Sequence, residues 1–155
     1  MQNQTRIIIE NVTPQLDGGV FAIKRIIGQK VQVNADVFSD GHDVIQSAVK
    51  FKHELEKKWY EVRMSPLEND EWQCEFKVDK QGTYTYFVEG WVDYALNWQH
   101  GTERKIFDSQ QVKSELLEGA EYVKEILKLA SKEEKKYLDT VVKLFMTESE
   151  YDNGV

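Results

Sequence analysis

The sequence predicts a mainly β protein with α-helices, in which an immunoglobulin-like antiparallel β-sandwich is followed by a helical hairpin. Three observations lead to this prediction. Hydrophobic and polar residues alternate through the first ninety residues, and Gly- and Asp-containing turns separate the alternating runs. After about Trp91 the hydrophobic spacing changes to three and four. A period of two is typical of half-buried strands, and a period near 3.6 is typical of amphipathic helices.

The predicted sandwich covers residues 1–108 and has six or so short strands. The clearest alternation runs from Lys30 to Phe38, with valines and an alanine on one face. The segment Gly82-Thr83-Tyr84-Thr85-Tyr86 places a Tyr at the start of a late strand, where its hydroxyl can bond back to the backbone and lock a corner. The strands are expected at residues 6–12, 30–38, 49–51, 59–62, 72–78 and 84–88.

The predicted helical part follows. Tyr94 and Trp98, four residues apart, indicate a short helix around 94–107, which Gly101 opposes. A hairpin is expected over 109–147, and residues 148–155 are expected to fray. One apolar stripe is predicted along its first helix and another along its second, and Ser131 to Glu134 reads as a capping box between them. The stripe residues are Val112, Leu116, Ala120, Val123, Leu127 and Ala130, then Leu138, Val141, Val142 and Phe145.

Size and charge exclude several classes of protein. The 155 residues are too few for a large catalytic barrel, which needs roughly 200 or more. A net charge of −7 argues against nucleic-acid and anionic-membrane binding, both of which need clustered cations. The first residues do not form a signal peptide, and the longest aliphatic run is only Ile7 to Ile9, so a cytoplasmic location is expected. The three histidines share no metal-ligand spacing, so neither a metal nor a cofactor is expected.

Two short segments contain residue types that could take part in catalysis or in cation binding. Asp40-Gly41-His42-Asp43 could bind a cation or orient a general base, but a turn with a positive φ at Gly41 is the favoured interpretation. Cys74 lies on the apolar face of its strand, where a small inert hydrophobe is favoured over a nucleophile. The many carboxylates could include a glycosidase pair, but most are expected on solvated faces.

The aromatic residues could form a platform for sugar rings. Trp72 is in phase with the predicted core. Trp91 is in phase with Phe87 and opposite to Tyr86 and Val88, so one of these two sets faces away from the sandwich interior. We expect the outward set to pack under the helical segment rather than to bind sugar.

Several sequence motifs occur in an order that is also found in the sequences of one known family. It closely resembles the N-terminal region of the bacterial α-1,4-glucan:maltose-1-phosphate maltosyltransferases, members of the α-amylase superfamily (glycoside hydrolase family 13). The motifs are Arg6 to Pro14, Asp17 to Arg25, Ala35 to Val44, Met64 to Leu67, Asn69 to Trp72, Gly82 to Tyr86, Glu89 to Asp93, Trp98 with Glu103 to Lys105, and Leu116 to Ala120.

The resemblance implies a longer parent enzyme that extends α-glucans from maltose 1-phosphate in a catalytic barrel. That barrel is absent from this chain, so no catalytic residue is assigned and no activity is expected for it alone. The matching region of the family is a β-sandwich with a helical insert that contributes to homodimerisation. The expected function is therefore a non-catalytic N-terminal module, with the parent barrel, a second copy and an α-glucan as partners. The candidate glucan-binding or interface residues are Trp91, Trp98, Asp40 and His42.

A second function stays open from the sequence. The chain could be a free-standing carbohydrate-binding sandwich that uses tryptophan and tyrosine faces. An apolar stripe left uncovered on the hairpin would favour the assembly module, whereas an exposed row of aromatic residues across one sheet would favour the carbohydrate-binding module.

Overall fold

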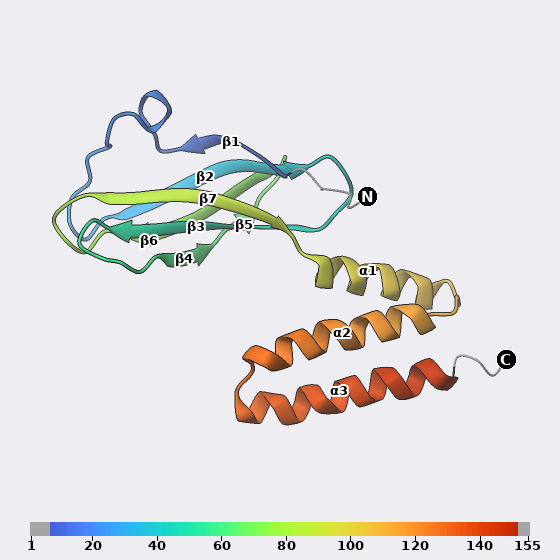
Figure 1. The fold of residues 1–155 in the computed structure, drawn as a ribbon. Helices are drawn as coiled ribbons and strands as arrows, with labels where there is room; N and C mark the ends of the chain where they lie inside the picture. Colours follow the sequence, from blue (N-terminus) through green and yellow to red (C-terminus); the bar gives the residue numbers. More distant parts are fainter. Residues whose placement is uncertain (1–6, 152–155) are drawn as a thin grey trace. The chain divides into compact units, whose positions relative to one another are not determined.

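The computed structural model describes residues 7–151, which form seven strands and three α-helices (Figure 1). They divide into two compact units, one ending at Asp93 and the other beginning at Tyr94. This division lies before the predicted limit at residue 108, because residues 94–107 form a helix that packs on the next helix of its own unit. Each unit is described separately below.

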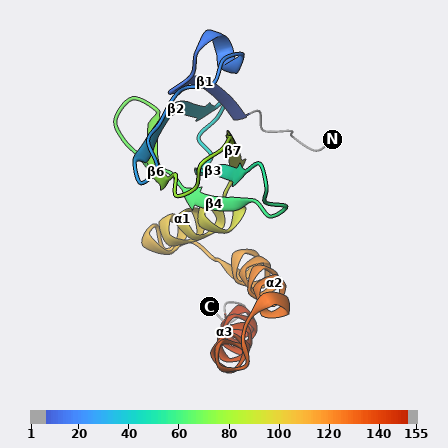
Figure 2. The same cartoon turned by 90° about the vertical axis from the view of Figure 1, so that its left-hand side faces the viewer.

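The first unit is a sandwich of two antiparallel sheets, which confirms the predicted mainly β fold with helices (Figure 2). One sheet has the order β1-β2-β6-β5 and the other β4-β3-β7. This arrangement matches the A-B-E-D and C′-C-F strands of an immunoglobulin-type sandwich. The strands are β1 (Ile7–Thr13), β2 (Lys30–Ser39), β3 (Ile45–His53), β4 (Tyr60–Arg63), β5 (Ser65–Pro66), β6 (Glu71–Lys77) and β7 (Tyr84–Val92).

The alternating residues of β2 and β6 form the core between the sheets. Val33 pairs with Cys74 and Ala35 pairs with Trp72, and all four side chains are buried. The indole N–H of Trp72 donates to the carbonyl of Val37 at 3.1 Å, so this large side chain is buried without an unpaired polar group. The alternation seen in the sequence is therefore the inward face of the first sheet.

Two tyrosines of β7 tie loops to the sandwich. The Tyr84 hydroxyl accepts the amide N–H groups of Asp79 and Lys80, at 3.2 and 3.1 Å, and donates to the Asp79 carboxylate at 2.7 Å. Tyr86 donates to the carbonyl of Pro14 at 2.5 Å, and so holds the segment that follows β1. The corner lock predicted for the Gly82–Tyr86 segment is formed by Tyr84.

The second unit contains α1 (Tyr94–Phe107), α2 (Lys113–Leu129) and α3 (Lys132–Tyr151). Helix α1 continues through Gly101 without a break, because its packing on α2 outweighs the low helix propensity of one glycine. The residues of both predicted stripes are buried or half-buried. Helix α3 extends to Tyr151, so residues 148–151 are helical; the rest of the predicted frayed tail lies outside the described residues, as does Arg6 of the first predicted strand.

The connection between α2 and α3 is closed by the predicted capping box. The Ser131 amide donates to the Glu134 carboxylate at 2.8 Å, and the Glu134 amide donates to the Ser131 hydroxyl at 3.4 Å. Each residue thus satisfies an orphan amide of the helix start. The hydrogen bonds from Ser131, from its side chain first and its backbone second, lower the pKa of Glu134.

Candidate functional site

The outward side of the three-stranded sheet carries three aromatic residues, of which Phe87 is exposed and Trp59 and Trp91 are half-buried. Val49 and Val88 pair with each other and contact the core, so the neighbouring residues of β3 and β7 point outward. We call this surface the outer sheet face. Its side chains are Lys50, Lys52, Trp59, Glu61, Arg63, Phe87, Glu89 and Trp91.

Cationic side chains cover part of these aromatic rings. The Arg63 guanidinium lies 4.4 Å from the Trp91 ring centroid, and the Lys52 ammonium lies 4.8 Å from that of Trp59. The edge of one ring meets the face of the other in the Trp59–Phe87 pair, with centroids 4.9 Å apart. The flat surfaces that a sugar ring would stack on are thus partly occupied by the protein's own side chains.

The carboxylates of the outer sheet face are paired with cations. Glu89 contacts Lys50 at 2.8 Å and Glu61 contacts Arg63 at 3.2 Å. The hydrogen bond with Glu89 raises the pKa of Lys50. These four charges form two separate ion pairs on the outer sheet face.

Asp40 and His42 lie in the exposed loop between β2 and β3. That loop leads into Ile45, and the next residue of β3 pairs with Trp91, so the loop and Trp91 share one end of the sandwich. The Ser39 hydroxyl donates to the Gly41 carbonyl at 3.3 Å. The predicted positive φ at Gly41 is wrong: its backbone lies outside the left-handed region, so this turn does not depend on glycine.

Trp98 lies in the other unit and is a packing residue there. Its indole N–H donates to the carbonyl of Glu115 at 2.6 Å, and its ring contacts Tyr122 and Phe145, with centroids 6.2 and 5.7 Å away. Trp98 therefore joins all three helices. Of the four candidate residues, Trp91, Asp40 and His42 belong to the first unit and Trp98 belongs to the second.

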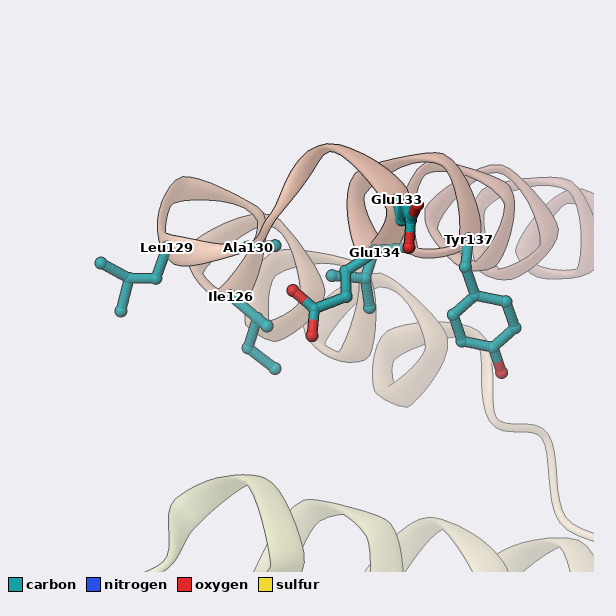
Figure 3. Close-up of a pocket in the computed structure, with 7 residues that line it drawn as sticks. Ile126, Leu129, Ala130, Glu133, Glu134 and Tyr137 are labelled. Carbon is teal, nitrogen blue, oxygen red and sulfur yellow. The ribbon is translucent and has the colours of Figure 1, made fainter.

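The α2–α3 connection forms an open apolar hollow of about 610 Å³ (Figure 3). Ile126 and Leu129 line it from α2 and Tyr137 from α3. Leu129 is 92% exposed and Tyr137 is 71% exposed. Glu133 and Glu134 also line the hollow, but Glu134 is engaged in the capping box. A hollow of this composition can bind an apolar surface.

Three residues of the hollow, Ile126, Leu129 and Tyr137, belong to a set of exposed apolar residues on the two helices, which we call the exposed hairpin surface. The hydrophobic spacing did not predict this set, because the predicted stripes are the buried ones. The sequence did contain an indication of these residues, since several apolar residues of 113–151 do not belong to the two predicted stripes. The members of the exposed hairpin surface are Leu117, Ile126, Leu129, Tyr137, Leu144 and Met146.

Cys74 is buried in the sandwich core and makes no disulfide. Burial, with a smaller effect of the Glu75 charge, raises the pKa of its thiol to about 11. A thiol that stays protonated at neutral pH is a poor nucleophile and metal ligand. Within residues 7–151, no three His, Cys, Asp or Glu side chains are grouped so that they could hold a metal ion, and no helix is long and apolar enough to cross a membrane.

Comparison with known proteins identifies similar sequences. The family model for α-1,4-glucan:maltose-1-phosphate maltosyltransferase, domain N/S, matches residues 5–153. The maltosyltransferase of Myxococcus xanthus is 40% identical over 118 residues, which are 74% of this chain and 18% of that protein. That of Chlorobaculum tepidum is 37% identical over 118 residues, 76% of this chain and 18% of the relative. That of Salinibacter ruber is 31% identical over 144 residues, 91% of this chain and 22% of the relative. The chain thus spans about a fifth of the length of these relatives.

Proposed function

Because the chain belongs to the α-1,4-glucan:maltose-1-phosphate maltosyltransferase domain N/S family, we propose that it is a non-catalytic module of a longer, glucan-extending maltosyltransferase. We further propose that it contributes to the assembly of a homodimer. The relatives support the first part, since the matched region is only 18 to 22% of each of them.

The exposed hairpin surface carries the assembly proposal. A helix of a self-sufficient domain shows one apolar stripe and a polar opposite face, whereas α2 and α3 have large apolar residues beyond the stripe they bury. Exposed apolar residues that lie together are characteristic of interaction sites, and Ile126, Leu129 and Tyr137 lie together at the hollow. A standard interface needs roughly 800 Å² from each partner, which two helices of 17 and 20 residues are long enough to supply.

The charges of α2 are compatible with a second copy as the partner. Lys124 pairs with Glu121 at 2.5 Å, and Lys128 pairs with Glu125 at 2.6 Å. These pairs lie within one helix, so these four charges are compensated without a partner on the second copy.

A non-catalytic role is favoured by what the two candidate surfaces contain. The carboxylates of the outer sheet face are held by Lys50 and Arg63, and the hairpin hollow is apolar. Cys74 is buried with a raised pKa. Neither surface offers an activated nucleophile beside a base, which group-transfer chemistry would need.

The second candidate function is glucan positioning, or a free-standing carbohydrate-binding module. It is favoured by the outer sheet face, where Phe87 is 39% exposed beside Trp59, and Trp91 lies four residues farther along β7 on the same face. Asp40 and His42 at the same end could add hydrogen bonds to sugar hydroxyls. The covered faces of Trp59 and Trp91 make assembly the better supported function of the two.

Sedimentation velocity tests the assembly proposal. We expect the chain, and the longer polypeptide that contains it, to dimerise, and the double variant Ile126→Ser with Leu129→Ser to weaken the dimer at least roughly tenfold. The helical circular dichroism should be unchanged, because both side chains are exposed. The control is Leu55→Ser, at an 85% exposed position of the sandwich, which should leave the dimer intact.

A dimer that is insensitive to the double variant, or a longer polypeptide that is strictly monomeric, would contradict assembly through the hairpin.

Titration with maltooligosaccharides, monitored by tryptophan fluorescence, tests the second candidate function. Glucan binding by a monomeric chain would favour the carbohydrate-binding module. Turnover of maltose 1-phosphate by the 155 residues alone would overturn the non-catalytic proposal.

A further inference from the structure

His53, the last residue of β3, is a histidine enclosed within the sandwich. Its side chain is 1% exposed, whereas His42 and His100 are exposed. Phe51, two residues earlier in β3, contacts the core, so His53 points to the same inward side. Neither the exposed hairpin surface nor the outer sheet face includes this side chain. The partners of its two ring nitrogens therefore show which form of the ring the fold holds.

The two ring nitrogens of His53 bond to the backbone of two different connections. The Leu55 amide, in the turn after β3, lies 3.2 Å from Nδ1. The Gln81 carbonyl, in the connection between β6 and β7, lies 3.0 Å from Nε2. An amide N–H only donates and a carbonyl oxygen only accepts, so Nδ1 is the acceptor and Nε2 the donor. The fold thus holds the neutral ring, with its hydrogen on Nε2.

A second proton on this ring is incompatible with one of these two bonds. The proton would go from water to Nδ1, whose lone pair already accepts the Leu55 N–H. Two N–H groups would then face each other, so the Leu55 amide would have to move away. The Leu55 side chain is 85% exposed, so burial of that side chain does not hold the turn in place. Protonation therefore acts first on the turn that follows β3.

Further bonds join the same two connections around Gly82. The Glu54 carboxylate accepts the Thr83 amide at 3.1 Å, and the Glu54 amide donates to the Thr83 carbonyl at 2.9 Å. Gly82 has a φ of 136°, and a Cβ there would lie 2.5 Å from both His53 Nε2 and a Glu54 carboxylate oxygen. The two connections are thus closely packed against the imidazole.

The charges around the ring act in opposite directions. The Glu54 carboxylate lies close to Nε2, and its negative charge favours the imidazolium, whereas the Leu55 N–H opposes it. The remaining charged and titratable groups of these segments are engaged with one another. Glu56 pairs with Lys80, and Asp79 accepts a hydrogen bond from the Tyr84 hydroxyl at 2.7 Å, while the Tyr84 ring meets the imidazole at a centroid distance of 5.0 Å.

Two of these partners keep their charge where a histidine titrates. The hydrogen bond from Tyr84 is the largest of the effects that lower the pKa of Asp79. The hydrogen bond to Glu56 is likewise the main reason that the pKa of Lys80 is raised. Histidine ordinarily gains its proton between about pH 8 and pH 5, where a carboxylate and an ammonium of this kind do not change charge. His53 is therefore the group of this cluster that responds to mild acid.

From these contacts we propose that His53 is a proton-sensitive switch at this end of the sandwich. The neutral ring joins the connection 54–59 to the connection 78–83, and protonation of Nδ1 releases the connection 54–59. That connection leads to Trp59, whose ring contacts Phe87 and Lys52 on the outer sheet face. Release therefore loosens one edge of that face. The inference does not depend on the proposed assembly, which uses the other unit.

Nuclear magnetic resonance of the labelled 155-residue chain, from about pH 7.5 to about pH 4.5, tests the proposal. Long-range nitrogen–proton correlation should show the His53 hydrogen on Nε2 alone at the higher pH, with His42 and His100 as exposed references. As Nδ1 gains a proton, water exchange of the Leu55 amide, corrected for its intrinsic pH dependence, should speed up at least roughly tenfold. The amides of β2, a central strand, are the internal control and should stay protected.

Two variants separate the ring's proton from other effects of acid. In His53→Asn the side-chain oxygen can accept the Leu55 N–H, as in an Asx turn, and it does not titrate. Leu55 exchange in this variant, relative to its own value at the higher pH, should not change with acid. Glu54→Gln keeps an acceptor for the Thr83 amide but removes the charge beside Nε2, so the release should move to lower pH.

Four outcomes would overturn the switch. The ring could stay neutral over the whole pH range, or become protonated while the Leu55 amide keeps its protection. Leu55 exchange could rise only together with that of β2, which would be unfolding of the whole sandwich. An acid response of Leu55 that is equal in His53→Asn and the natural chain would place its cause outside the imidazole.

Discussion

The sandwich and the helical unit bury their apolar residues to very different extents. Of the fourteen hydrophobic side chains that are buried among the described residues, twelve lie in the sandwich and only Ala120 and Val142 lie in the helices. The sandwich core is contiguous and draws on both sheets. The helices depend instead on the contacts of Trp98 and on half-exposed stripes. A unit with so small a core is the one that gains most from packing against a partner.

The largest effect should come from Trp72→Ala. The change removes a side chain that is 6% exposed, together with its hydrogen bond to Val37, and should cost the sandwich about 3–5 kcal/mol of unfolding free energy. Urea unfolding measures the loss, and hydrogen exchange locates it. The comparison predicts that amides of α2 and α3 keep their exchange rates; if they speed up together with those of the sandwich, the two units are one cooperative structure.

Gly119→Ala should have the next largest effect, on the helical unit alone. A Cβ at position 119 would lie 2.1 Å from a ring carbon of Trp98, so α1 and α2 must separate, at a cost of about 1–3 kcal/mol. Gly101→Ala is the matched control. Its Cβ would meet no atom within 4 Å, so the helix should gain about 0.5–1 kcal/mol from the lower backbone entropy. Thermal unfolding at 222 nm distinguishes them, and equal effects would contradict this account of Trp98 packing.

Ser131→Ala should have the smallest effect, about 1 kcal/mol lost from the helical hairpin at pH 7. Hydrogen bonds from Ser131 lower the pKa of Glu134 below its ordinary value of 4.5. A carboxylate with a lowered folded-state pKa stabilises the fold above the unfolded-state value, and this contribution is lost as the pH falls through the folded-state value. The variant should therefore lose less stability between pH 5 and about pH 3 than the natural chain does.

Thermal unfolding of the hairpin at several pH values measures this difference. The control is Thr140→Ala, in the interior of α3, where the hydroxyl bonds only to the Lys136 carbonyl within the same helix. It should leave the pH dependence unchanged and slightly raise the stability, because alanine favours helix more than threonine does. An acid dependence that is equal in natural chain and Ser131→Ala would exclude the capping box as its source.

The strands and the helical hairpin could be predicted because their signals are local. The alternation of β2 and β6 reflects one buried face, and the capping box needs only four consecutive residues. The spacing of Tyr94 and Trp98 indicated the helix at 94–107, but not that it would continue through Gly101, because the packing that stabilises it comes from α2. The backbone of Gly41 was predicted wrongly for a related reason: a turn motif indicates a bend without fixing its dihedral angles.

The candidate sites were less predictable than the fold. Trp91 was recognised as in phase with Phe87, but its cover by Arg63 depends on β4 lying beside β3 in the right register. Trp98 was named as a glucan-binding or interface candidate, and in the structure its side chain joins the three helices. A tryptophan in a sequence does not show whether its ring is exposed, since exposure depends on residues distant along the chain.

By itself, the sequence determined the class of the fold, the inward face of β2 and β6, the buried stripe of the helices and the family, because periodicity and ordered motifs indicate each of them. Only the tertiary structure decided which apolar residues stay uncovered and how the strands pair. Leu129 differs from Leu127 not in chemistry but in which side of the helix meets another helix. Burial and strand pairing are relations between distant segments, so they are settled only when those segments come together.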